Sequence, residues 1–201
     1  MIKKQNYLKH AIVLFLLLLF MQPERAWAAY ENVEFSSLTN HDGLTNSQVG
    51  AILKDTRGYI WFGTQSGLCR FDGFRMKTFY YINTDDKSLP NNSVDELQQD
   101  YGGNIWVHTS VGYCIYKYDE EQFERKPEEW LKNIHVQGPP YKLLIDKDKN
   151  MWIAVYGQGL YYHNAKTKNT YLFKFTKKAQ PGCLKEGNIS KITEVDGDAL
   201  I

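Results

Sequence analysis

Three of the five tryptophans recur at a nearly constant interval. Trp61 and Trp106 lie 45 residues apart, and Trp106 and Trp152 lie 46 apart. Each stands in a short apolar run, and the segments around the three runs can be aligned with one another. Self-similarity at a fixed period is the sequence signature of repeat architectures. The sequence therefore predicts tandem repeats of about 45 residues.

The first repeat is predicted to form four short strands separated by tight turns. Its strand-like runs cover residues 49–54, 59–64, 68–71 and 74–80. Asp55 and Gly58 bound the first turn, because Asp can accept hydrogen bonds from nearby backbone and Gly can take a positive φ. The pair Asp72-Gly73 is a hairpin signal between the last two runs.

Four antiparallel strands in each repeat are the pattern of propeller blades. One such sheet cannot bury both faces alone, so neighbouring blades must stack, with the repeated tryptophans between them. An α-solenoid would need helical periodicity, and a β-helix would need a shorter period. The predicted fold is an all-β, incomplete β-propeller of four-stranded blades. Its repeats are expected at about 43–87, 88–135 and 136–183, with a truncated fourth at 184–201.

The repeated tryptophans and turn glycines are interpreted as blade structure rather than as a phosphate-binding loop. They are Trp61, Trp106, Trp152, Gly58, Gly63, Gly67, Gly103, Gly112 and Gly159. Cys69 and Cys114 occupy the same place in successive repeats, which indicates packing. Together with Cys183 they make an odd number, so no structural disulfide is expected.

The N-terminus predicts export. Three lysines precede an unbroken apolar run at 11–21, and Ala26-Trp27-Ala28 has the small-x-small pattern of a cleavage site. Residues 1–28 are predicted to be a signal peptide, residues 29–201 the partial propeller, and the destination the periplasm. A retained signal anchor is the alternative. Removing residues 1–28 changes the formal charge from +1 to −2, which leaves no basic patch for nucleic acid.

The first repeat also resembles a known family. The string from Asp55 through Gly58, Trp61 and Gly63 to Asp72 closely resembles the two-component-regulator propeller repeat. The lead-in at 35–49 resembles the start of the periplasmic sensor of hybrid two-component systems, as found in gut Bacteroidetes. The second and third repeats depart from the pattern at His108 and Ala154, where Gly is usual.

The resemblance implies a ligand-sensing extracytoplasmic module that is not itself an enzyme. In that family, two seven-bladed propellers and a β-sandwich precede a membrane helix, a histidine kinase core, a receiver and a DNA-binding module. The implied ligand is an oligosaccharide, and the implied output is control of polysaccharide-utilisation genes. The full-length protein is expected to be a homodimer in the inner membrane. Membrane contact is expected only through parts beyond this chain.

No catalytic, cofactor-binding or metal-ligating residue is predicted. Asp146-x-Asp148-x-Asn150 has the first half of a calcium loop but aligns with a hairpin turn, which is favoured. His108 and His135 lack partners at a spacing typical of a triad or a metal site. The candidates for sugar stacking are Tyr156, Tyr161 and Tyr162, with packing between blades as the alternative.

Two further functions stay open at this point. A streptogramin-lyase-like propeller enzyme has a similar Gly-x-Ile-Trp-Phe strand, but there Thr-Glu typically follows, whereas Gly63-Thr64 follows Phe62 here. A secreted protein-binding propeller without a kinase is the other alternative. Fold alone cannot separate these functions.

Overall fold

The computed structural model describes residues 36–177, 181, 183–185, 189–195 and 198–200. The chain divides into two units, Met1–Ser37 and Leu38–Ile201, and almost all described residues belong to the second. The predicted signal peptide at 1–28 lies outside the described residues. Within the described part of the chain, no helix has the length and apolar character needed to span a membrane.

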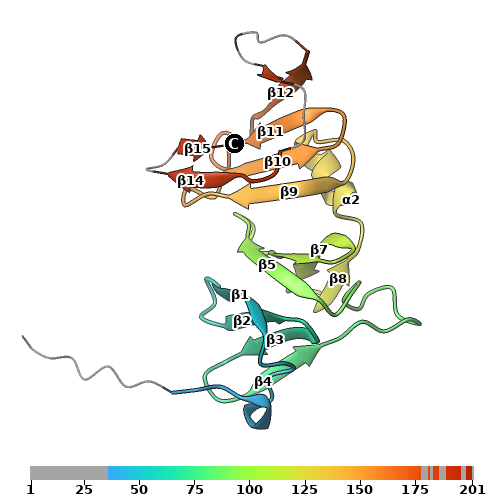
Figure 1. Cartoon of the computed structure of the whole chain (residues 1–201), viewed down its shortest axis with the longest axis vertical. Helices are drawn as coiled ribbons and strands as arrows, with labels where there is room; N and C mark the ends of the chain where they lie inside the picture. Colours follow the sequence, from blue (N-terminus) through green and yellow to red (C-terminus); the bar gives the residue numbers. More distant parts are fainter. Residues whose placement is uncertain (1–35, 178–180, 182, 186–188, 196–197, 201) are drawn as a thin grey trace, which may run out of the picture. The chain divides into compact units, whose positions relative to one another are not determined.

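Three successive four-stranded antiparallel sheets form the body of the second unit (Figure 1). We call them blades 1, 2 and 3. Blade 1 contains β1 (Val49–Lys54), β2 (Ile60–Thr64), β3 (Gly67–Phe71) and β4 (Met76–Phe79). Blade 2 contains β5 (Val94–Gln99), β6 (Ile105–Thr109), β7 (Gly112–Lys117) and β8 (Gln122–Glu124). Blade 3 contains β9 (Pro140–Ile145), β10 (Met151–Val155), β11 (Gly159–His163) and β12 (Thr170–Thr176).

The remaining elements are short. The 3-10 turn η1 (Asn40–Asp42) precedes blade 1, and β13 (Leu184–Lys185) adds a parallel strand to β12. A two-stranded sheet of β14 (Thr193–Val195) and β15 (Asp198–Leu200) follows. These sheets confirm the predicted all-β fold of four-stranded blades. Only the fourth strand of blade 1 is clearly shorter than predicted. Asp72 accepts hydrogen bonds from the backbone of Phe74 and Arg75, which extends the turn.

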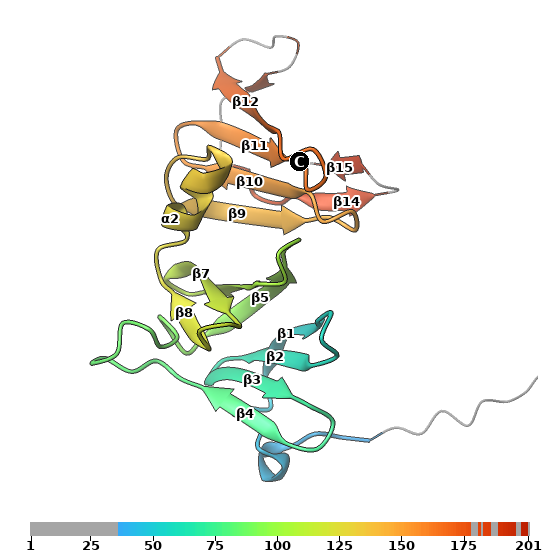
Figure 2. The same ribbon diagram turned by 180° about the vertical axis from the view of Figure 1, so that it is seen from behind.

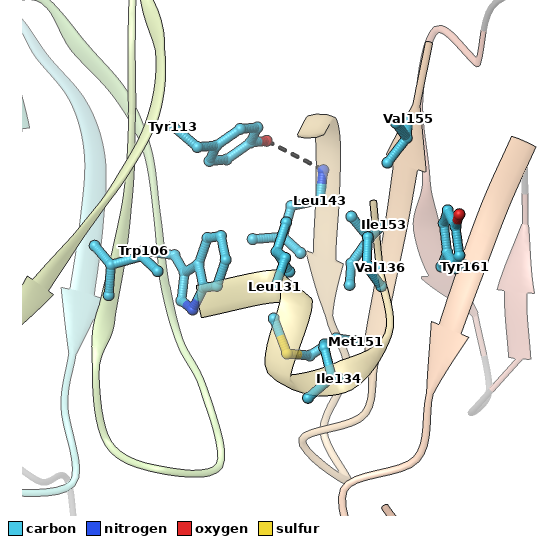
Figure 3. Close-up of a cluster of buried hydrophobic side chains, with 11 residues drawn as sticks. Trp106, Tyr113, Leu131, Ile134, Val136, Leu143, Met151, Ile153, Val155 and Tyr161 are labelled. Atoms are coloured by element: carbon cyan, nitrogen blue, oxygen red, sulfur yellow. Dashed lines mark hydrogen bonds between the residues drawn. The ribbon is translucent and has the colours of Figure 1, made fainter. Parts of the chain in front are cut away.

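The first two repeated tryptophans lie in the cores between blades. Trp61 is fully buried and belongs to a cluster that includes Leu97 and Val107 of blade 2. Trp106 is buried with Leu143 and Ile153 of blade 3, as Figure 3 shows. A buried indole removes a large apolar area from water, so these rings contribute much to blade stacking. The predicted role of the tryptophans is confirmed at both junctions.

A short helical insert between blades 2 and 3 was not predicted from the sequence. It consists of α2 (Pro127–Leu131) and η2 (Lys132–Ile134) and is visible in Figure 2. Leu131 and Ile134 are buried in the same cluster as Trp106. The insert therefore completes the core between blades 2 and 3.

The first strand of every blade carries a β-bulge at the same place. Val49 pairs with Thr64 and Ala51 with Gly63, so Gly50 is the extra residue in β1. By the same registers, Asp95 is the extra residue in β5 and Tyr141 is the extra residue in β9. A bulge leaves its extra residue outside the ladder and changes the direction of its side chain.

Candidate functional site

The two blade junctions differ at one repeat position. At the first junction, a Cβ atom added to Gly63 would lie 2.6 Å from Cγ1 of Val94. The backbone of β2 therefore approaches blade 2 too closely for a side chain. At the second junction, His108 and Pro140 occupy the positions equivalent to Gly63 and Val94. There His108 and Pro140 line a cavity, whereas Gly63 and Val94 are in close contact at the first junction.

This cavity, which we call the junction pocket, has a volume of about 480 Å³. Its walls come from β6, β7, β9, the start of α2 and the β10–β11 turn. The lining residues used below are His108, Tyr113, Arg125, Glu128, Tyr141 and Tyr156. A concave site with convergent polar groups at a structural junction is the usual place for a small-molecule ligand.

One side of the junction pocket is polar. Nδ1 of His108 lies 2.6 Å from a carboxylate oxygen of Asp95, the bulge residue of β5. The Tyr113 hydroxyl donates to Glu96 at 2.8 Å and accepts from the backbone N–H of Leu143 at 3.2 Å. Burial, and next the negative charge of Glu96, raise the pKa of Tyr113, so this phenol stays protonated.

The other side of the junction pocket is aromatic. The rings of Tyr141 and Tyr156 stack with centroids 4.0 Å apart and an angle of 21° between their planes. Tyr156 is 63% exposed. The Tyr141 hydroxyl accepts a hydrogen bond of 3.0 Å from the backbone N–H of Ile189. The exposed Tyr156 ring therefore rests on the half-buried Tyr141, which this hydrogen bond holds in place.

The three candidate tyrosines do not come together. Tyr156 lies in the junction pocket, whereas Tyr161 is buried and lines a separate cavity of about 620 Å³ on blade 3. Tyr162 points to the opposite face of β11 and packs on Trp152 with centroids 4.4 Å apart. Adjacent residues of a strand alternate between faces, which separates these two side chains. Sequence reasoning missed Tyr141, which is the extra residue of the bulge in β9.

The other positions singled out from the sequence lie mainly in turns. Asp146 accepts hydrogen bonds from the backbone and side chain of Asn150, which confirms the predicted hairpin turn. Among the described residues, no group of three His, Cys, Asp or Glu side chains could hold a metal ion. His135 is exposed and ends η2 with a positive φ of 62°. Five repeat glycines also have positive φ: Gly58, Gly67, Gly103, Gly112 and Gly159.

The blades, the bulges and the junction pocket define a β-propeller module with a candidate ligand site between two blades. Residues 43–66 match the family model described as the two component regulator propeller. This match confirms the resemblance of the first repeat.

Two known proteins are similar to the chain. Histidine kinase P4 of Formosa agariphila is 41% identical over 61 residues, which are 30% of this chain and 4% of that protein. The extracellular domain of a hybrid two-component system from B. thetaiotaomicron has a TM-score of 0.56 at 24% sequence identity. That similarity covers 82% of this chain and 23% of the solved chain, and it supports the fold. The chain thus spans a small part of each of these proteins.

Proposed function

We propose that this chain is part of the extracytoplasmic sensor of a hybrid two-component signalling protein. The match of residues 43–66 to the two component regulator propeller carries the proposal. The similar proteins include a histidine kinase and an extracellular domain of a hybrid two-component system, which fits this role. The full-length protein would then be a dimeric sensor kinase in the inner membrane.

The ligand in this proposal is an oligosaccharide, and the response is the expression of polysaccharide-utilisation genes. The junction pocket supports a small ligand because an exposed aromatic ring and hydrogen-bonding side chains both line it. Flat aromatic rings provide contact area with little conformational entropy to lose. Ligand binding would favour one of two states of the membrane protein.

The test is to delete the gene in its own bacterium and to measure transcripts during growth on single polysaccharides. We expect one polysaccharide to induce its utilisation genes only when the gene is present. In parallel, the purified extracytoplasmic part should bind oligosaccharides of that polysaccharide without changing them. Hydrolysis or elimination of the bound oligosaccharide would contradict the sensor and favour the propeller enzyme.

A further inference from the structure

We infer that the junction pocket takes an uncharged sugar and rejects acidic sugars. This inference rests on the proposed function and specifies the chemical class of its ligand. The argument comes from the charged groups around the pocket and from what each of them already binds.

One carboxylate lies in the wall of the junction pocket and two more lie next to it. Glu128 lines it directly, and Asp95 and Glu96 adjoin it through their hydrogen bonds to His108 and Tyr113. The Asp95 side chain is 54% exposed, so its free lone pairs can accept hydrogen bonds from hydroxyl groups. A uronate or sulfate brought to the same place would meet like charge as it lost its water.

Two cations, Arg125 in the pocket wall and Lys142 beside Glu96, already have hydrogen-bond partners. Arg125 donates from Nε to the carbonyl of Ser88 at 2.9 Å and from Nη2 to the carbonyl of Asp85 at 2.8 Å. The Lys142 ammonium lies 3.2 Å from the carboxylate of Glu96. A ligand anion would have to displace these partners, and Arg125 holds the loop between β4 and β5 in place.

The stacked tyrosines add the second half of the recognition. The exposed ring of Tyr156 can cover the apolar face of a pyranose, and the hydroxyl groups of the sugar can donate to Glu128, which lines the same pocket. Neutral hydroxyls can donate to carboxylates, whereas acidic groups cannot when they are ionised. The pocket therefore selects by accepting hydrogen bonds and by repelling negative charge.

The test is isothermal titration of the whole extracytoplasmic part of the protein with two panels of tetrasaccharides. The neutral panel contains gluco-, manno-, galacto- and xylotetraose. The acidic panel contains tetragalacturonate, tetramannuronate and a sulfated galactotetraose. We expect at least one neutral probe to bind and every acidic probe to bind at least tenfold more weakly. Tyr156→Ala should weaken the neutral probe at least tenfold, and the matched control Tyr80→Ala, an exposed tyrosine of blade 1, should leave it within twofold.

A further variant tests the charge argument directly. Glu128→Lys should raise the affinity for the acidic probes at least fivefold, with an unchanged melting temperature showing that the fold is intact. If an acidic probe binds more tightly than the neutral ones and Tyr156→Ala weakens that binding, the inferred class of ligand is wrong but the proposed sensor function still stands. If Tyr156→Ala does not change the affinity of a probe that binds, the junction pocket is not the binding site. If no probe of either panel binds, the oligosaccharide sensor itself is wrong.

Discussion

The indole Nε1 of Trp61 donates a hydrogen bond of 2.7 Å to Oδ2 of Asp55, six residues earlier in the chain. The same pairing joins Trp106 to Asp100 at 3.0 Å and Trp152 to Asp146 at 3.4 Å. In each blade, one carboxylate therefore holds both the β-hairpin turn and the repeated tryptophan. This pairing explains why the tryptophan and the turn recur together.

The first prediction concerns Asp100, which is 2% exposed. It accepts hydrogen bonds from the backbone of Gly102 and Asn104 and from the Trp106 indole. Asp100→Ala removes the partner of the buried Trp106 indole N–H and of two backbone N–H groups in the turn, so we expect a loss of roughly 2–4 kcal/mol in the free energy of unfolding. Urea denaturation of the wild type and the variant measures this change in the free energy of unfolding. Asp148→Ala, at an exposed position of the equivalent turn in blade 3, is the control and should change stability by less than about 0.5 kcal/mol.

The second prediction concerns the close contact at the first junction. Gly63→Ala places a methyl group against Val94, and we expect a destabilisation of about 1–3 kcal/mol by overpacking. Val94→Ala in the same protein should recover part of that loss, because it removes the clashing methyl groups. A double-mutant cycle from thermal unfolding tests this coupling. Strictly additive effects would show that the two positions do not touch.

The third prediction concerns pH. His163 is 1% exposed, and burial, followed by the charge of Lys168, lowers its pKa below the ordinary 6.5. The unfolded chain therefore binds the proton more tightly than the folded chain. The His163 contribution to stability is complete above pH 6.5 and is lost as pH falls from there through the folded pKa. Titration of this one group changes the free energy of unfolding by at most about 1.4 kcal/mol per pH unit.

Two variants identify the titrating group. In His163→Gln, the free energy of unfolding should fall less steeply than in the wild type as the pH is lowered below 6.5. Tyr162→Phe, in the neighbouring position of the same strand, should keep the wild-type slope. The hydrogen bond that Thr170 donates to the Ile134 carbonyl makes this hydroxyl an acceptor for His163 Nδ1–H, at 2.9 Å. Among the described residues, no polar atom pairs with Nε2. An unchanged profile in His163→Gln would contradict this assignment.

The fourth prediction concerns thiol reactivity. Cys69 and Cys114 are buried, and burial raises the pKa of the Cys114 thiol, so little reactive thiolate forms there. Cys183 is only partly buried. Maleimide labelling of the native protein should modify Cys183 within minutes and the other two only after denaturant is added. Peptide mapping assigns the sites, and Cys183→Ser should remove the fast phase.

The repeat, the strands and the turns could be predicted because they depend on local signals. Asp55 and Gly58 specify a turn whichever neighbour the blade acquires. The helical insert could also have been found, since Pro127 at its start with Glu128 and Glu129 in the first turn is a helix signal. It was missed because five residues are too few to show helical periodicity.

The junction pocket could not be predicted in the same way. Its volume depends on how far apart two blades lie, and no single repeat carries that information. The departure of His108 from the usual Gly was visible in the sequence, but its meaning required the position of Pro140 on the next blade. The pairing of Tyr141 with Tyr156 likewise needed the bulge, because strict alternation along β9 does not reveal it.

The recurring bulge keeps one position of each blade outside the strand ladder. Gly50, Asp95 and Tyr141 occupy one equivalent site in three blades, yet they are as different as a glycine, an acid and an aromatic residue can be. Because this position makes no ladder pairing, the sheet itself does not dictate the side chain there. The neighbouring blade does so at the first junction, where a Cβ on Gly50 would lie 3.2 Å from the Val94 carbonyl oxygen. Single substitutions at the bulges of blades 2 and 3 would therefore change the surface beside the junction pocket while the inherited scaffold stays the same.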